Sequence, residues 1–297
     1  MMNNKTHIPI PLKYRPRKFK DLIGQESIVQ TLQNAIKLKR IANAYLLTGV
    51  RGVGKTTSAR IIAMSLNCSS IDETIESFQE PCGTCENCMA IIESRSVDVL
   101  EMDAASRTGI SDIRELIEGV QYAPISSKYK VYIIDEVHML STAAFNGLLK
   151  TLEEPPPHVK FIFATTEVRK IPTTILSRCQ RYDLKRVEPK SLADFLSEIC
   201  NSENVTIDDG ALKILSRAAD GSVRDGLSLL DQAISYSENN LSEKLIKEMI
   251  GLNDPTEILN LLEYVIEGKI SKALENLNFL YHNGADPSLI LKDLIIN

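Results

Sequence analysis

A glycine-rich segment between an expected strand and an expected helix constrains the fold more than any other part of the chain. Residues 49–56 read GVRGVGKT, which matches the phosphate-loop pattern G-x-x-x-x-G-K-[ST]. Residues 45–49 read as a short buried strand, and residues 55–66 carry apolar side chains at helical spacing. Because this strand–loop–helix context is the one in which the pattern binds phosphate, the sequence predicts a nucleotide-binding α/β domain.

Each residue type in this loop has a physical role. Glycines let backbone N–H groups curve around phosphates, and the helix that follows contributes the positive end of its dipole. Lys55 is expected to reach the β- and γ-phosphates, and the Thr56 hydroxyl is expected to ligate Mg²⁺. The residues expected to contact ATP here are Gly49, Gly52, Val53, Gly54, Lys55, Thr56 and Thr57.

An acidic pair ends a second apolar strand. Residues 131–134 are apolar or aromatic, and Asp135 and Glu136 follow them directly. A hydrolytic nucleotide site needs an acid that holds the metal ion, which we assign to Asp135, and a base that activates water, which we assign to Glu136. The pair therefore predicts hydrolysis of ATP as well as binding.

Residues 135–138 also match the D-E-x-H box of helicases, so a translocase driven by nucleic acid is an alternative function. Such motors need a second ATPase-like domain with its own arginine-bearing motif. The sequence after residue 183 offers no second set of strands for one. We therefore expect His138 to pack beside the site.

Alternating strand and helix patterns predict a parallel sheet in the first part of the chain. The expected strands are 45–49, 97–102, 131–135 and 159–165, and the expected helices are 26–39, 55–66, 111–121 and 141–153. After about Asp183 the strands are expected to stop, and helices are expected at 189–201, 208–219, 222–236, 241–250, 255–267, 270–283 and 286–296. These changes predict a base domain at 1–183, an all-helical domain at 184–251, and a helical segment at 252–297 that is too short to bury a core by itself.

Four of the six cysteines are spaced like metal ligands. Two residues separate Cys82 from Cys85 and Cys85 from Cys88, and Cys68 lies upstream, which predicts a metal module at about 67–90. Zinc is the first choice, and a closed four-cysteine site leaves no position for substrate, so its role should be structural. An iron–sulfur cluster is the competing interpretation, but no Cys-Pro follows to complete a ferredoxin run.

Charge and hydropathy exclude other classes of function. Lys and Arg total 34 and Asp and Glu total 39, a net charge of -5, so any nucleic-acid binding must use a local patch. Mean hydropathy is -0.08, and no apolar run approaches the roughly 18 residues of a membrane span, so we expect no membrane segment. The N-terminus lacks the apolar core of a secretory signal, and we expect a cytoplasmic protein.

An ordered series of short segments extends from about residue 13 to 250. It consists of Lys13-Tyr14-Arg15-Pro16, Gly24-Gln25-Glu26, the phosphate loop, the four-cysteine insertion, Asp103-Ala104-Ala105-Ser106, Asp135-Glu136-Val137-His138-Met139-Leu140, Leu152-Glu153-Glu154-Pro155-Pro156, Ser177-Arg178-Cys179 and Gly221-Ser222-Val223-Arg224-Asp225. In this order the series resembles the gamma/tau family of bacterial DNA polymerase III. Its members are AAA+ clamp-loader ATPases, which open a ring-shaped sliding clamp and place it on primed DNA.

The resemblance implies a fold and further site residues. The fold is an AAA+ base domain with a parallel sheet, followed by a helical lid at 184–251 and part of a helical collar at 252–297. Thr166, beside Thr165, corresponds to a sensor of the γ-phosphate. Arg178 corresponds to an arginine finger that reaches the ATP of a neighbouring subunit, and Arg224 to a second sensor on the lid.

The remaining ligands follow from the same resemblance. Adenine is expected near Tyr14 and Arg15. The resemblance implies three cofactors, which are ATP, Mg²⁺ and Zn²⁺. The family's zinc module corresponds to Cys68, Cys82, Cys85 and Cys88, and its magnesium ligands correspond to Thr56 and Asp135. Arg107 and Thr108 are candidates for a contact with DNA phosphate, with a helix cap as the alternative.

The resemblance also implies partners and leaves one alternative. The expected partners are other clamp-loader subunits of the delta and delta-prime type, the sliding clamp and primer–template DNA. The family continues past residue 297 with the rest of the collar and, in its longer form, with segments for the polymerase and the helicase. We see no polymerase active site in the sequence. A scaffold subunit that holds ATP without hydrolysing it remains the alternative, and the catalytic residues Lys55, Thr56, Glu136 and Arg178 favour the motor.

Overall fold

The computed structural model describes residues 8–72, 77–106, 110–237, 240–250 and 255–282, together with positions 287, 290, 291 and 294. The chain divides into two compact units. The first comprises Met1–Leu192 and Ala219–Asp225, and the second comprises Ala193–Ala218 and Gly226–Asn297. Across the described residues, every helix is too short or too polar to cross a bilayer.

The first unit contains a parallel sheet. Its described strands are β1 (Ala44–Thr48), β2 (Val99–Asp103), β3 (Lys130–Asp135), β4 (Val159–Thr165) and β5 (Gln180–Asp183), in the spatial order β2-β3-β4-β1-β5. All four neighbouring pairs are parallel, and the register places Asp103 beside Asp135 and Thr48 beside Thr165. The carboxyl ends of the strands therefore share one edge of the sheet. The arrangement confirms the predicted α/β class.

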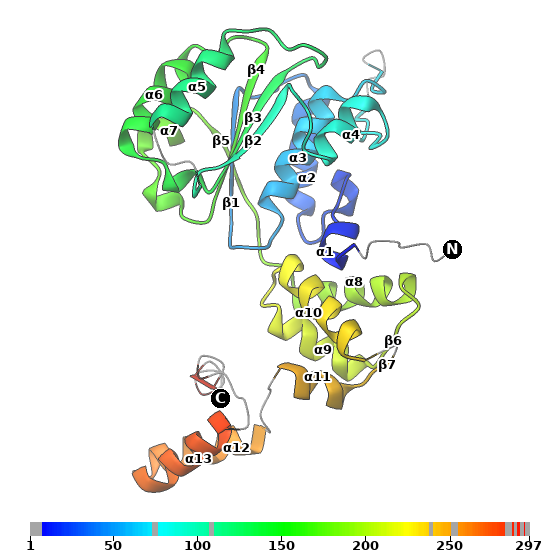
Figure 1. Cartoon of the computed structure of the whole chain (residues 1–297), viewed down its shortest axis with the longest axis vertical. Helices are drawn as coiled ribbons and strands as arrows, with labels where there is room; N and C mark the ends of the chain where they lie inside the picture. Colours follow the sequence, from blue (N-terminus) through cyan, green and yellow to red (C-terminus); the bar gives the residue numbers. More distant parts are fainter. Residues whose placement is uncertain are drawn as a thin grey trace, which may run out of the picture. The chain divides into compact units, whose positions relative to one another are not determined.

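Helices cover both faces of this sheet. Figure 1 shows one group on one side and a second group on the other. The first group is α2 (Glu26–Lys37), α3 (Lys55–Asn67) and α4 (Glu86–Ile92), and the second is α5 (Ile110–Val120), α6 (Thr142–Glu153) and α7 (Thr173–Leu176). Further helical elements of this unit are a short helix α1 (Ile10–Lys13) and three 3-10 turns, Phe19–Asp21, Val137–Met139 and Val168–Lys170.

The period-2 pattern of β1 explains the two cores of this unit. Successive strand residues point to opposite faces. Tyr45 and Leu47 join the core that contains Ile62 of α3, whereas Leu46 joins the core that contains Leu148 of α6. All of these side chains are at most 1% exposed, so β1 is fixed from both sides. The loop that follows β1 therefore begins from a rigid point.

The two outer strands of the sheet carry charged pairs. On β2, the Arg60 guanidinium donates from Nε and Nη2 to the Glu101 carboxylate at 2.6 and 2.8 Å. On β5, Arg181 Nε donates to Asp183 Oδ1 at 2.6 Å. These strands are the edges of the sheet in the order given above.

The second unit is mainly helical. Its elements are α8 (Pro189–Ser202) and α10 (Val223–Tyr236), which include residues of both units, and α9 (Asp209–Ala218), α11 (Glu243–Ile250), α12 (Pro255–Ile266) and α13 (Ile270–His282). Ile258 and Leu261 of α12, Leu280 of α13 and Ile290 form a small core.

Three strands differ from the sequence prediction. β5 was not expected, because only Tyr182 of its four residues is buried and the segment has little apolar pattern. The prediction that strands stop after Asp183 is also wrong. Two short strands, β6 (Thr206–Ile207) and β7 (Asn240–Leu241), form a parallel pair. Two residues are too few for a periodic signal. The expected helix at 286–296 lies largely outside the described residues.

Candidate functional site

The phosphate loop joins β1 to α3 as predicted, and its backbone needs glycine. Gly54 is the N-cap of α3 and adopts a left-handed conformation with φ 101°. Gly52 has φ +79°, and a Cβ there would lie 1.9 Å from Ser222 Oγ. Any larger residue at position 52 would therefore strain the backbone and collide with Ser222. Helix α3 begins at Lys55, so its N-terminal N–H groups face the loop.

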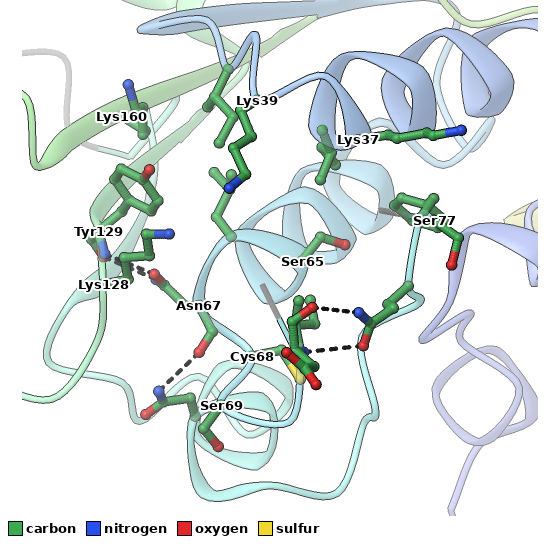
Figure 2. A pocket seen from close by; sticks show the side chains of 18 of the residues that line it. Lys37, Lys39, Ser65, Asn67, Cys68, Ser69, Ser77, Lys128, Tyr129 and Lys160 are labelled. Atoms are coloured by element: carbon green, nitrogen blue, oxygen red, sulfur yellow. Dashed lines mark hydrogen bonds between the residues drawn. The ribbon is translucent and has the colours of Figure 1, made fainter. Parts of the chain in front are cut away.

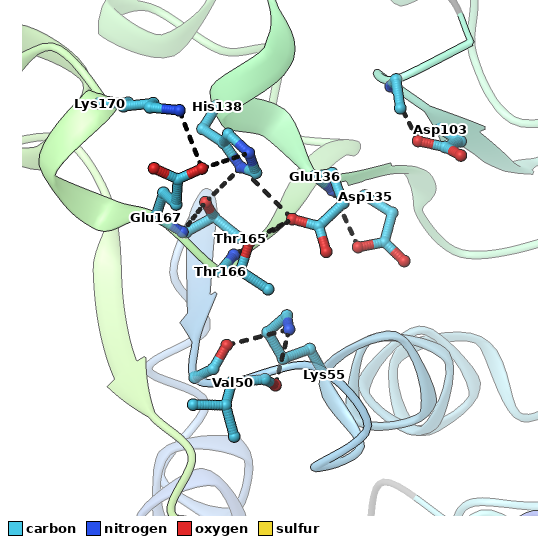
Figure 3. Close-up of polar contacts among 12 residues, drawn as sticks. Val50, Lys55, Asp103, Asp135, Glu136, His138, Thr165, Thr166, Glu167 and Lys170 are labelled. Carbon is cyan, nitrogen blue, oxygen red and sulfur yellow. Dashed lines mark hydrogen bonds and ion pairs between the residues drawn. The ribbon is translucent and has the colours of Figure 1, made fainter. Parts of the chain in front are cut away.

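Lys55 is held within the loop that contains it. Its Nζ donates to the carbonyl oxygens of Gly49 and Val50, both at 3.0 Å, and the residue is only 6% exposed. Burial lowers the pKa of Lys55, and the nearby charges of Glu136 and Asp135 oppose that shift. In Figure 3 the Lys55 side chain points toward the acidic residues at the ends of the strands. The ammonium group is thus placed where phosphate charge would be stabilised.

The two expected magnesium ligands meet across the sheet edge. Thr56 Oγ1 donates a short hydrogen bond to Asp135 Oδ2, and the other Asp135 oxygen accepts from the Glu136 N–H at 2.9 Å. Thr56 is in the first turn of α3, and Asp135 is the last residue of β3. Two oxygen atoms this close can bind one small, hard cation, so the donor set fits Mg²⁺.

Glu136 is bound to Thr166, which brings together two residues of the predicted site. Glu136 Oε2 accepts from the Thr166 N–H at 3.2 Å and from its hydroxyl at 3.0 Å (Figure 3). Glu136 itself has φ 46°, an uncommon left-handed backbone for a residue with a side chain. Its side chain remains 30% exposed. A carboxylate that is oriented and still reachable by water suits a general base.

His138 contributes more to this network than its expected packing role. Its Nδ1 lies 2.9 Å from Thr165 Oγ1 and 3.3 Å from Glu136 Oε2, and its Nε2 lies 3.4 Å from Glu167 Oε1. The His138 side chain is 6% exposed, and Lys170 Nζ donates to Glu167 at 2.9 Å. The imidazole therefore connects the strand-end acid to the segment after β4. The D-E-x-H pattern was the only sequence signal for this contact.

Arg15 and Arg224 also lie beside the phosphate loop. The Arg15 Nε donates to Thr57 Oγ1 at 3.2 Å, and the Arg224 backbone N–H donates to the Gly52 carbonyl at 3.3 Å. Burial lowers the pKa of Arg15, and the charges of Arg60 and Arg224 lower it further. The charge of Glu101, which pairs with Arg60, opposes this shift. Tyr14 is half-buried next to Arg15.

Arg178 has a different environment from the other predicted site residues. Its guanidinium bonds to Glu153, Thr174 and Ser177, and it has no described contact with the phosphate loop. A finger that serves a neighbouring subunit is expected to lie away from the chain's own nucleotide. Arg107 and Thr108, the candidates for DNA contact, lie outside the described residues.

The four predicted metal-ligating cysteines come together. The Sγ atoms of Cys68, Cys82, Cys85 and Cys88 all lie within 4.8 Å of one another. Zinc bound to four thiolates at 2.3 Å needs sulfur atoms about 3.8 Å apart, so the cluster fits zinc with a small contraction. The two remaining cysteines, Cys179 and Cys200, lie outside this group, and burial raises the pKa of each.

Backbone donors surround these sulfur atoms. Cys82 Sγ accepts from the N–H groups of Thr84 at 3.4 Å and Cys85 at 3.2 Å. Burial disfavours the Cys82 thiolate, but these bonds and one from the Ser70 hydroxyl outweigh burial and lower the pKa of Cys82 to about 5. Burial is likewise outweighed by hydrogen bonds at Cys85, whose pKa is lowered, whereas burial raises the pKa of Cys68 and Cys88. Metal binding requires all four thiols to lose their protons.

A cavity of about 550 Å³ borders this cluster on the side of Cys68 (Figure 2). It lies at the amino ends of β3 and β4, the edge of the sheet opposite the phosphate loop. Asn67 fixes one wall, because its side chain bonds to the backbone N–H and carbonyl of Tyr129. The carbonyl of Asn67 also accepts from Asn87, so α3, α4 and the segment before β3 are tied together here.

Comparison with protein families identifies three consecutive matches. Residues 24–188 match the family described as DNA polymerase III, delta subunit. Residues 191–239 match the ATPase lid domain of the DNA polymerase III clamp loader subunit, and residues 241–296 match domain III of DNA polymerase III subunits gamma and tau. The matches follow one another along the chain.

Individual relatives agree with these matches. The DNA polymerase III subunit tau of Salmonella typhimurium is 45% identical over 95% of this chain and 43% of its own length, and that of Bacillus subtilis is 46% identical over 95% and 49%. The subunit gamma of Buchnera aphidicola subsp. Schizaphis graminum is 44% identical over 95% of this chain and 77% of its own length. The chain thus spans less than half the length of these tau subunits.

Solved structures give the fold. The RuvB protein of Thermotoga maritima superposes with a TM-score of 0.59 at 18% identity, covering 86% of this chain and 80% of that one. The shared architecture is the AAA+ fold, as the sequence predicted. Because the tau and gamma subunits named above are 44% identical or more over 95% of this chain, and residues 241–296 match domain III of these subunits, the chain belongs to the gamma/tau family of DNA polymerase III subunits.

Proposed function

We infer that this chain is an ATP-hydrolysing motor subunit of a bacterial clamp loader, which couples ATP binding and hydrolysis to the loading of a sliding clamp on primed DNA. The observation that carries the proposal is the convergence of Lys55, the Thr56–Asp135 pair and the Glu136–Thr166 pair at one edge of the sheet. Membership of the gamma/tau family supports the biological context.

The chain's own residues suit the steps of hydrolysis. Backbone N–H groups of the loop and the first turn of α3 would hold the phosphates, and Lys55 would exchange its two carbonyl partners for phosphate oxygens. Thr56 and Asp135 would hold Mg²⁺, which neutralises charge on the phosphates when bound. Glu136 would accept a proton from the attacking water, with Thr166 orienting its carboxylate.

Two arginines extend this site. Arg224, whose backbone already contacts Gly52, would sense the bound nucleotide at the start of α10. Arg178 would act on the ATP of a neighbouring subunit, where it stabilises negative charge in the transition state. The scaffold alternative is disfavoured because the Glu136 carboxylate is oriented by three contacts with Thr166 and His138, an arrangement that binding alone does not require.

Domains and partners follow from the same proposal. We assign the base to 1–183, the lid to 184–251 and a collar segment to 252–297, a division supported by the family matches at 24–188, 191–239 and 241–296. The proposed partners are delta- and delta-prime-type subunits, the sliding clamp and primer–template DNA in the cytoplasm. Contacts with polymerase and helicase belong to longer family members.

Steady-state ATP hydrolysis tests the proposed function. We expect low turnover by the chain alone and turnover about a thousandfold higher when the other loader subunits, the clamp and primed DNA are added, because assembly supplies Arg178 in trans. The control omits only the clamp. ATP binding without any stimulation by the complete mixture would contradict the motor and favour a scaffold.

Zinc in the four-cysteine cluster is a separate proposal with its own prediction. We expect one zinc per chain, and we expect Cys88→Ser to lose zinc and to lower the free energy of unfolding by about 3 kcal/mol, because Cys88 is fully buried among the other sulfur atoms. Elemental analysis and denaturant unfolding measure both effects. Cys179→Ser is the matched control, and iron in place of zinc, or full zinc content in Cys88→Ser, would contradict the assignment.

A further inference from the structure

The guanidinium of Arg178 makes three hydrogen bonds within its own chain. Its Nη2 donates to Glu153 Oε1 at 2.5 Å, and its Nη1 donates to the Thr174 carbonyl at 2.7 Å and to Ser177 Oγ at 3.2 Å. Among the described residues, Nε has no hydrogen-bond partner. These contacts use at most three of the five guanidinium N–H groups, so the Nε–H and one N–H of Nη2 are left for an oxygen from outside the chain.

The groups that bind Arg178 are themselves fixed by buried neighbours. Glu153 is the last residue of α6, directly after Leu152, which is 6% exposed. Thr174 is in α7, directly before Ile175, which is 1% exposed. Leu152 and Ile175 belong to the same core on one face of the sheet. The Glu153 carboxylate and the Thr174 carbonyl therefore bind the guanidinium from fixed positions.

Stability alone does not account for the ion pair. The side chains of Arg178 and Glu153 are 31% and 51% exposed, and exposed pairs of this kind contribute at most about 1 kcal/mol to folding. A free arginine side chain, in contrast, has many rotamers, and each hydrogen bond to a fixed group removes some of them. The effect of the pair is therefore mainly on where the guanidinium points.

We propose that Glu153 is a positioning residue for Arg178, which holds the guanidinium in the orientation needed to meet phosphate oxygens of a neighbouring subunit's ATP. This inference rests on the proposed function. Preorganisation lowers the barrier of the chemical step without changing how tightly the chain binds its own nucleotide. Glu153 thus acts through Arg178 and does not touch the substrate.

A matched set of variants tests this role in the assembled loader. Glu153→Ala removes the carboxylate, Glu153→Gln keeps the shape and one acceptor, and Glu154→Ala changes the adjacent exposed glutamate, which has no described side-chain contact. We expect kcat of the clamp- and DNA-stimulated reaction to fall about tenfold for Glu153→Ala at unchanged KM, with Glu153→Gln in between and Glu154→Ala unaffected. ATP affinity of the chain alone should stay the same in all three.

A double-mutant cycle shows whether Glu153 acts through the arginine. Once Arg178 is alanine, the further change Glu153→Ala should reduce kcat by less than twofold, whereas independent roles would give the full tenfold again. Equal kcat for Glu153→Ala and wild type, in a complex that Arg178→Ala inactivates, would overturn the positioning role and leave the proposed function intact. No assembly-dependent stimulation in the wild type would overturn both.

Discussion

Replacement of Lys55 by alanine is expected to abolish ATP binding at micromolar nucleotide. Lys55 contributes the ammonium that would pair with the β- and γ-phosphates, and a charge-assisted contact of this kind is worth about 3 kcal/mol or more, roughly a hundredfold or greater loss of affinity. Calorimetric titration with Mg·ATP measures the change. In the structure this ammonium group is held at the loop by the carbonyl groups of Gly49 and Val50.

The control for this experiment must separate lost binding from lost folding. Lys55 is buried and makes two hydrogen bonds to its own loop, so thermal unfolding of the variant is measured alongside binding. Lys190→Ala, at an exposed position in the first turn of α8, removes the same charge far from the loop in sequence. Wild-type ATP affinity in a folded Lys55→Ala chain would refute the role of the phosphate loop.

Replacement of Arg178 by alanine should reduce hydrolysis and leave ATP binding intact, in contrast to the replacement of Lys55. We expect stimulated hydrolysis by the assembled loader to fall about a thousandfold, because a trans arginine stabilises charge that develops only in the transition state. ATP binding by the isolated chain should be unchanged, since the described contacts of Arg178 are with Glu153, Thr174 and Ser177. Single-turnover hydrolysis and equilibrium binding give the two values.

Arg169 provides the matched comparison for Arg178. It is exposed in the 3-10 turn after β4, and Arg169→Ala should leave both stimulated turnover and binding at wild-type values. If Arg178→Ala also retains stimulated turnover, the finger assignment is wrong. If Arg178→Ala instead loses ATP binding in the isolated chain, Arg178 serves its own nucleotide and not a neighbour's.

Sequence patterns predicted the parts of the fold and site that are local in the chain. The phosphate loop, the acidic pair and the cysteine spacing each lie within a short segment, so residue types at fixed intervals were sufficient. The strands β1, β3 and β4 were equally clear because nearly all of their residues are buried. In contrast, β5 has one buried residue in four, and an exposed edge strand has no apolar run to detect.

Residue spacing within a short segment does not predict contacts between segments that are distant in the sequence. The bond between Glu136 and Thr166 joins residues that are 30 apart, and the pair of Glu153 and Arg178 joins residues that are 25 apart. The resemblance to a family suggested that Thr166 and Arg178 matter, but neither partner followed from spacing. Strand order decides which segments meet, and it places β4 beside β3 and so brings the two strand ends together.

The charged pairs on the outer strands have a consequence for a protein proposed to work beside copies of similar chains. An exposed sheet edge can accept a strand from another molecule, which leads to fused sheets and aggregation. Glu101 on β2 and Arg181 on β5 put charges on both edges, and each charge is already neutralised by a partner on its own chain. Such edges resist strand addition, so the sheet of this chain would remain closed to the sheets of its proposed neighbours.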